Sequence, residues 1–193
     1  FTADPRIIDS AKLIDEITYD EMLEMSSSGA GVLMARSVEF GRRYNVPIIV
    51  KSTFTNNKGT VVKEKTMEEA IVSGVTHNDK EVKFTLFGVP DQPGIAGTVF
   101  GSLSEIGTNV DMIVQNVSKE SITDISFTAP SEQQKDVEDT LKNISKQLDA
   151  KGYDVDENIA RISIIGAGMK SESGVASKMF KTLGDNKINI SMI

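Results

Sequence analysis

The clearest candidate for ligand chemistry is the loop at residues 89–94, which reads Val-Pro-Asp-Gln-Pro-Gly. Pro93 fixes φ, Gly94 permits close approach of the backbone, and the N–H groups of a following helix form an anion site. Asp91 adds a carboxylate that can hold an ammonium group. A zwitterionic amino acid satisfies both charges. The alternative is that Asp91 only caps the helix and Gly94 only makes a tight turn.

A second candidate lies at the first six residues, Phe-Thr-Ala-Asp-Pro-Arg. The hydroxyl of Thr2, the carboxylate of Asp4 and the guanidinium of Arg6 fall within one short turn. That combination suits a phosphate or a magnesium–phosphate group. The alternative is a turn stabilised by an Asp–Arg pair at the surface.

Other chemistry finds little support. The chain has no Cys and a single His, His77, which excludes thiolate zinc sites, cysteine nucleophiles and a supported Ser/His/Asp set. Gly166-Ala167-Gly168 resembles the start of a dinucleotide fingerprint, but Ser171 stands where the third Gly is required. We therefore expect no metal site, no cysteine nucleophile and no Ser/His/Asp set in this chain.

Composition narrows the class of protein. The 193 residues include 21 Lys and Arg against 28 Asp and Glu, a net charge of −7, so a basic footprint for nucleic acid is missing. No apolar run is long enough to span a membrane, and the 39% hydrophobic and 25% charged content is that of a soluble globular protein. We expect a cytoplasmic protein. The chain starts at Phe1 without an initiator Met and reads as a piece of a longer polypeptide.

The first sixty residues predict two helices and a strand. Thr18 and Glu21 have the spacing of a capping box, so a helix should begin at about Tyr19. A second helix is expected over 35–44 and a strand over 46–50. A polar run with turn formers follows at 53–59, which places a domain boundary near residue 60.

The second part of the chain contains an internal repeat with an offset of 80 residues. Seven of the twenty positions from 94 to 113 are identical in the second copy: Gly94/Gly174, Ala96/Ala176, Phe100/Phe180, Leu103/Leu183, Asn109/Asn189, Met112/Met192 and Ile113/Ile193. Each copy predicts an apolar strand (82–89 and 160–165), a loop, an amphipathic helix and a second strand. Asn109 and Asn189 are expected to open that second strand, as turn residues or as amides that bind a ligand.

Between the copies, 121–129 predicts another strand, and Ser131 with Gln134 predicts a capped helix that runs to about residue 150. This order is most of a ferredoxin-like βαββαβ unit, so the fold class is α/β (α+β). The second copy ends at Ile193 with two strands only, and residues 61–78 are a candidate donor of its missing elements.

Several segments resemble aspartate kinases: 1–6, Thr-Tyr-Asp-Glu-Met at 18–22, Gly-Ala-Gly-Val-Leu at 29–33, Arg-Ser-Val-Glu-Phe at 36–40, Val-Asp-Met-Ile-Val-Gln-Asn at 110–116, Thr-Asp-Ile-Ser-Phe at 123–127 and Gly-Ala-Gly-Met at 166–169. The resemblance implies that 1–60 is the C-terminal part of the kinase domain with a linker. It implies a first ACT unit at 82–150, inserted in a truncated second ACT unit formed by 61–81 and 151–193.

In that family the reaction is ATP-dependent phosphorylation of the side-chain carboxylate of L-aspartate, giving 4-phospho-L-aspartate, with ATP and Mg²⁺ bound by the full-length enzyme. The resemblance implies that the catalytic residues precede Phe1, so the chain alone should be inactive and bind no cofactor tightly. Phe1 stands where the family usually has Tyr, and many members have Lys at position 31. The residues implied to line the ATP site are Phe1, Thr2, Ala3, Asp4, Pro5, Arg6, Gly31 and Val32.

The resemblance also implies allosteric feedback inhibition by lysine, threonine or both, bound in a homodimer formed through the ACT units. The implied effector contacts are Asp91, Gln92, Pro93, Gly94, Ile95, Ala96, Asn109, Val110, Asp111 and Gln115 of one unit, with Val175, Ala176, Asn189 and Ile190 of the other. The alternative is a non-catalytic amino-acid-sensing subunit made of ACT units, which forms a hetero-oligomer with a full-length kinase.

Overall fold

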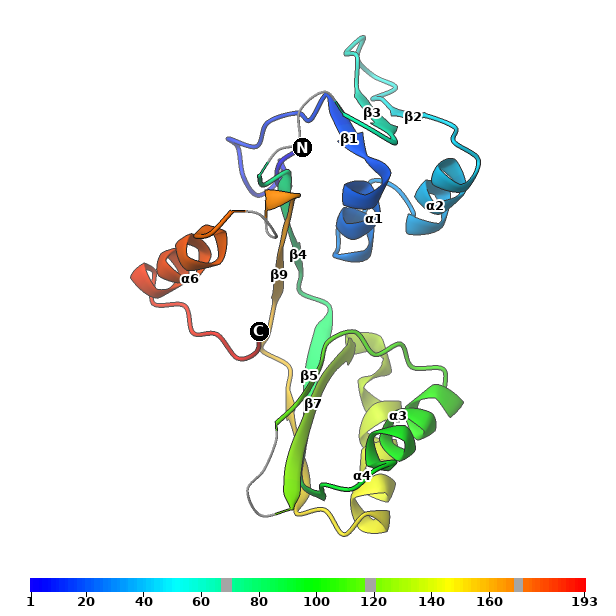
Figure 1. The fold of residues 1–193 in the computed structure, drawn as a ribbon, viewed down its shortest axis with the longest axis vertical. Helices are drawn as coiled ribbons and strands as arrows, with labels where there is room; N and C mark the ends of the chain where they lie inside the picture. The colour runs from blue at the N-terminus through cyan, green and yellow to red at the C-terminus, as the bar shows by residue number, and fades with distance from the viewer. Residues whose placement is uncertain (67–70, 117–120, 169–171) are drawn as a thin grey trace. The chain divides into compact units, whose positions relative to one another are not determined.

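The structure is a computed structural model, and it describes residues 1–66, 71–116, 121–168 and 172–193. Unit 1 combines Phe1–Asn78 with Ile162–Ile193, and unit 2 is Asp79–Arg161 (Figure 1). Unit 2 is therefore inserted in the chain of unit 1. Three points of the sequence analysis lie outside the described residues: positions 67–70 of the donor segment, Met169 and Ser171.

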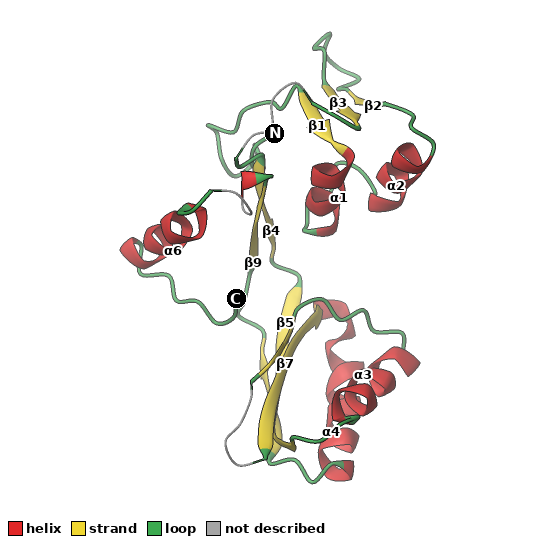
Figure 2. Ribbon diagram, in the orientation of Figure 1, coloured by secondary structure: helices red, strands yellow, loops and turns green. Residues whose placement is uncertain are grey.

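Unit 2 is a complete ferredoxin-like βαββαβ unit. Its sheet has the order β6-β7-β5-β8 with antiparallel neighbours, and helices α3 and α4 cover one face (Figures 1 and 2). The expected strands and helices are confirmed. In chain order the elements are β5 (Glu81–Pro90), α3 (Ile95–Glu105), β6 (Ile113–Gln115), β7 (Ile122–Pro130), the 3₁₀ turn η1 (Ser131–Gln133), α4 (Gln134–Gln147) and β8 (Gly152–Asp156).

Buried apolar side chains on one face of β5 and β7 form the core of unit 2. Phe84 of β5 and Phe127 of β7 are fully buried, lie opposite each other, and stack with ring centroids 5.3 Å apart. Val99 and Leu103 of α3 close the core from the helical side, together with three residues of α4. Each fully buried side chain of this size contributes about 1.5–3 kcal/mol.

A β-bulge in β5 keeps its last core residue pointing inward. Leu86 and Val89 are both buried although three positions separate them, so regular alternation cannot place both on one face. The pairing register with β7 shifts between these residues, and Gly88 adopts φ +62° there. The Gly88 N–H donates to Asp124 Oδ1 at 2.8 Å, which satisfies the donor that the bulge removes from the ladder.

Among its described residues, unit 1 contains two small open sheets and three helices of nine or more residues. Strands β1 (Glu16–Thr18), β3 (Thr60–Lys63) and β2 (Ile48–Val50) form one sheet in that order, and β4 (Gly74–Asn78) pairs with β9 (Arg161–Ile165). The helices are α1 (Tyr19–Ser27), α2 (Ala35–Arg43) and α6 (Val175–Asp185).

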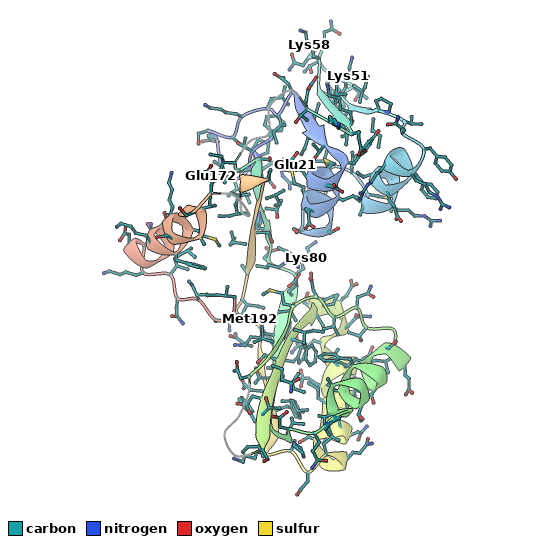
Figure 3. The ribbon with its side chains drawn as sticks, in the orientation of Figure 1. Glu21, Lys51, Lys58, Lys80, Glu172 and Met192 are labelled. Carbon is teal, nitrogen blue, oxygen red and sulfur yellow. The ribbon has the colours of Figure 1, made fainter. Side chains whose placement is uncertain are left out.

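The Glu21 carboxylate joins three parts of unit 1 at the start of α1 (Figure 3). It accepts the N–H of Thr18 at 3.1 Å and the Thr18 hydroxyl at 2.8 Å, while the Glu21 N–H donates to Thr18 Oγ1. The predicted capping box is thus confirmed. The hydroxyl of Ser73, just before β4, also donates to this carboxylate.

The structure differs from the expected domain boundaries at two strands. β3, assigned in part to the second ACT unit, pairs with β1 and β2, whereas β4 of the same segment pairs with β9. β8, also assigned to the second ACT unit, pairs with β5 from Lys83 to Phe87. The sequence analysis did not predict β8 as a strand, because its pairing partner β5 lies more than sixty positions earlier in the chain.

Two smaller expectations were wrong. Ser131 does not cap a helix through its side chain: it begins η1, and its N–H donates to Lys80 O at 2.9 Å. Asn109 and Asn189 do not open strands. β6 begins only at Ile113, whose counterpart in the repeat is Ile193, and residues 188–193 form no strand.

The repeat is confirmed helix for helix. α3 and α6 both begin at a glycine in the left-handed region, Gly94 with φ +97° and Gly174 with φ +114°. The first helical hydrogen bond is also the same in both copies. The Thr98 N–H donates to Gly94 O at 3.0 Å, and the Lys178 N–H donates to Gly174 O at 2.9 Å. Nothing lies within 4 Å of a Cβ built on either glycine, so the backbone conformation and not space requires glycine here.

We therefore expect Gly94→Ala and Gly97→Ala to change stability in opposite directions. A Cβ on Gly94 strains a left-handed residue and should lower the free energy of unfolding by about 1–2 kcal/mol. Gly97 lies inside α3 with equally open space, so Ala there should raise it by about 0.5–1 kcal/mol through helix propensity. Urea unfolding measures both; a change of the same sign in the two variants would contradict this explanation.

Candidate functional site

Residues 1–6 form a turn built around an Asp4–Arg6 pair. Asp4 accepts the Arg6 backbone N–H at 2.9 Å, Nε at 3.0 Å and Nη2 at 2.7 Å. These bonds, the side-chain bond first, lower the pKa of Asp4 from 3.8 to about 2. Because Nε and Nη2 are engaged, Nη1 is the terminal nitrogen that the turn presents for another anion.

The rest of this turn is fastened to unit 1 by Thr2. Its N–H donates to Lys12 O at 2.8 Å, its hydroxyl accepts the Lys12 N–H at 3.0 Å, and its carbonyl accepts the Val75 N–H of β4 at 2.8 Å. Phe1 and Pro5 are exposed, and Ala3 is half-buried. The Thr2 hydroxyl therefore has a structural role and the aromatic ring is accessible.

Gly31 and Val32 lie in the turn between α1 and α2, and both are exposed. No hydrogen bond or ion pair described for this chain joins them to residues 1–6. A Cβ on Gly31 would meet nothing within 4 Å. The space beside the Gly31 Cα is therefore open to a side chain.

The Asp91 loop in unit 2 leads directly into the start of α3. The N-cap of α3 is Gly94, with no side-chain cap bond, so the alternative that Asp91 caps the helix is wrong. The Asp91 N–H donates to Ser121 O at 2.8 Å, which holds the loop, while the side chains of Asp91, Gln92 and Pro93 stay exposed. Beyond them, Ile95 and Ala96 are half-buried in the first turn of α3, where N–H groups lack helical acceptors.

Asn109, Val110 and Asp111 lie far from that loop within unit 2. The Asp111 N–H donates to Thr128 O at 3.1 Å, and Thr128 lies opposite Lys83 of β5. Between Lys83 and Asp91 the chain advances ~3.3 Å per residue, roughly 25 Å in all. The predicted effector residues therefore form two groups: loop group 91–96 and strand-entry group 109–111.

The other candidate residues lie between the two groups or at the two ends of α6 in unit 1. Gln115 of β6 is opposite Ile125 of β7, between the two groups, and is exposed. In unit 1, Val175 and Ala176 begin α6, whereas Asn189 and Ile190 lie beyond its end and are exposed. An α-helix of this length separates its two ends by about 16 Å.

Sequence reasoning missed one cluster of charges and one pocket, both within unit 2. Arg161, at 13% exposure, contacts the carboxylates of Glu81 and Asp111, which are 80 and 50 positions away in the chain. No local spacing signals such a contact. The pocket, of about 370 Å³, lies beside the bulge and is lined by Phe87, Gly88, Asn116, Ile122, Thr123, Asp124 and Lys151.

Neither a metal-ligand cluster nor a helix that could span a membrane is found among the residues that the structure describes. There, no three His, Cys, Asp or Glu side chains converge as a metal site would require, and His77 is half-buried in β4. Among the same residues, no helix has both the length and the apolar character needed to cross a bilayer.

The Asp4–Arg6 geometry predicts an acid-resistant pair. A carboxylate with a lowered pKa keeps its contribution above its ordinary pKa and loses it only as the pH falls through the lowered value, so the pair should survive from neutral pH down to about pH 4. NMR titration of the Asp4 carboxyl should give a midpoint of about 2. Arg6→Gln should move the midpoint toward 3.8, and Arg42→Gln should not. An ordinary midpoint in the unmodified protein would refute the pairing.

Comparison with known proteins gives matches along the whole chain. Residues 1–52 match the amino acid kinase family, and residues 83–149 and 162–193 each match the ACT domain. The aspartate kinase of Pseudomonas fluorescens is 44% identical over 100% of this chain and 48% of its own length. An aspartokinase of Helicobacter pylori is also 44% identical, over 49% of its length. The chain thus spans about half the length of these curated relatives.

Solved structures agree with these matches. The regulatory subunit of aspartate kinase from Thermus thermophilus is 34% identical with a TM-score of 0.61, over 64% of this chain and 82% of that one. E. coli aspartokinase III, in complex with aspartate and ADP, is 26% identical with a TM-score of 0.82, over 100% and 43%. A kinase segment and two ACT segments in one chain, together with 34% identity over 82% of the Thermus thermophilus regulatory subunit, show that the chain belongs to the aspartate kinase family.

Proposed function

We propose that this chain corresponds to the C-terminal half of an aspartate kinase that phosphorylates L-aspartate with ATP to 4-phospho-L-aspartate and is inhibited by an end-product amino acid. The observation that carries the proposal is the 44% identity over the whole chain to aspartate kinases. The chain contains a kinase segment and two ACT segments in one polypeptide, as these relatives' match along the whole chain requires. The residues assigned here bind nucleotide or effector, and none is assigned a catalytic role.

In this proposal the turn at residues 1–6 is one wall of the ATP site, with Gly31 and Val32. Asp4 holds the Arg6 guanidinium so that Nη1 can receive a phosphate oxygen. Phe1, which is 53% exposed, offers a ring to the base or ribose. Asp4 is engaged by Arg6 and the described residues offer no cluster of oxygen ligands, so the chain itself does not fit Mg²⁺; we assign the ion to the phosphates of ATP.

The effector in this proposal is lysine, threonine or both. Asp91 is exposed and uncommitted to the helix cap, so its carboxylate is placed to receive an α-ammonium near the start of α3. One solved structure of E. coli aspartokinase III contains lysine and aspartate in a T-state. That complex supports an amino-acid effector for a related protein, and we extend it to this chain as part of the proposal.

A homodimer through the ACT units completes the proposal. β6 is an edge strand with Ile113 at 52% exposure, and α6 has no fully buried residue, so both present apolar surface. The second candidate function is a non-catalytic regulatory subunit that pairs with a full-length kinase. The match to 82% of a Thermus thermophilus regulatory subunit favours it. In either case we propose a cytoplasmic location, where ATP is available to the kinase.

The test uses the protein encoded by the complete reading frame. We expect aspartate- and ATP-dependent formation of an acyl phosphate, trapped with hydroxylamine, and inhibition of that activity by lysine, threonine or their mixture. Activity without any response to these amino acids would refute the regulatory part. No activity, but binding of a lysine or threonine ligand and activation or inhibition of an added kinase, would favour the subunit.

Asp91→Asn should weaken effector binding without harming the fold. The change removes one charge-assisted hydrogen bond, a loss of about tenfold to a hundredfold in affinity. Asp139→Asn removes an equally exposed carboxylate from α4 of the same unit and serves as the control. Calorimetric titration with lysine and threonine, alone and together, measures the affinity. An unchanged affinity in Asp91→Asn would remove this residue from the site.

A further inference from the structure

Arg161 bridges two carboxylates at one end of unit 2. Its Nη2 lies 3.0 Å from Glu81 Oε1, and its Nη1 donates to Asp111 Oδ2. The Arg161 side chain is 13% exposed, that of Glu81 5% and that of Asp111 49%. The two terminal nitrogens of one guanidinium thus hold one buried and one accessible carboxylate. A lysine has a single ammonium and no such fork.

The buried half of this bridge joins the two ends of unit 2. Glu81 is the first residue of β5, opposite Pro130 at the end of β7, and Arg161 is the last residue of unit 2. The chain therefore enters and leaves the unit beside this ion pair. A carboxylate as buried as that of Glu81 requires a charged partner, because an unpaired charge there is strongly destabilising.

The accessible half of the bridge positions Asp111. The backbone of this residue is anchored to β7 by its N–H bond to Thr128 O, and the next N–H, that of Met112, donates to Thr128 Oγ1 at 3.3 Å. Thr128 itself is buried at 3% exposure. With the main chain held by Thr128 and Oδ2 held by Arg161, Oδ1 is presented in a defined orientation to a hydrogen-bond donor from outside.

We propose that Arg161 is a positioning residue of the strand-entry group: it orients Asp111 toward the ammonium group of an amino-acid effector and links that contact to both chain connections of unit 2. The inference rests on the proposed effector function. An ammonium bound at Asp111 competes with Arg161 for the Asp111 carboxylate. It thereby changes the strength of the ion pair between Arg161 and Glu81. Binding at Asp111 and the arrangement of the two chain connections are then coupled, and the coupling is reciprocal.

The test compares Arg161→Lys with Arg42→Lys in the complete protein. Lys at 161 keeps a positive charge for buried Glu81 but cannot hold both carboxylates, so folding should persist while effector affinity falls about fivefold or more. Arg42 forms an Arg–Asp pair of 2.7 Å with Asp20 at the exposed surface of unit 1, and its replacement should change nothing. Affinity for lysine and threonine is measured by calorimetry. Without effector, kcat and the KM values for ATP and aspartate should stay constant. A general loss of structure would change them.

A double-variant cycle separates positioning from simple structural support. Asp111→Asn should weaken effector binding as Arg161→Lys does, and the two changes together should weaken it no further than the stronger single change. Losses that multiply, or an unchanged affinity in Arg161→Lys, would overturn the inference. If the unmodified protein binds neither lysine nor threonine, the effector proposal itself fails. If it binds them with an affinity that does not change in Arg161→Lys, only the positioning role of Arg161 is refuted.

A second variant keeps the test decisive if Arg161→Lys does not fold. The pair Glu81→Gln and Arg161→Met removes both buried charges together, which leaves no unpaired charge in the interior. It also leaves Asp111 without its partner. The same loss of effector affinity is expected, and the affinity of the unmodified protein in this pair variant would overturn the inference.

Discussion

The pairing of β4 with β9 is the constraint on which the rest of the chain depends. β4 ends at Asn78 and β9 begins at Arg161, so one strand pair closes a loop that contains the whole of unit 2. Neighbouring strands lie about 4.8 Å apart, which requires the first and last residues of the insert to lie close together. The ferredoxin-like unit meets this requirement because its first strand and the chain after its last strand meet at one end of the sheet, where Glu81 and Arg161 form their ion pair.

Local sequence signals predicted most of the elements, because these signals act within a few residues. The capping box at Thr18 and the glycines that begin α3 and α6 are of this kind. β8 was missed because its half-buried Gly-Tyr-Asp-Val-Asp sequence becomes a strand only through pairing with β5, more than sixty positions earlier. The bulge at Gly88 was missed for the same reason: only the register with β7 makes it necessary.

The same difference between local and long-range contacts decides which candidate sites the sequence could predict. The Asp91 loop could be identified from the types and spacing of its own residues, and the structure adds that the helix cap does not consume its carboxylate. The two-group division of the effector residues could not be identified, because it depends on where Asp111 meets β7 and not on the distance along the chain. The contact of Arg161 with Asp111 spans fifty positions and has no sequence signature.

Within the proposed effector function, the separation of the loop group from the strand-entry group gives a reason why one amino acid would be bound between two ACT units. One molecule cannot reach both groups of a single unit across roughly 25 Å, but two units packed in opposite directions would place the loop of one beside the strand entry of the other. The two composite sites are then unlike. Asp91 and Asp111 both belong to the first copy, and the matching positions of the second copy are Ser171 and Ser191. Both aspartates therefore come from the ferredoxin-like unit: the Asp91 N–H donates to Ser121 O, and the Asp111 carboxylate pairs with Arg161.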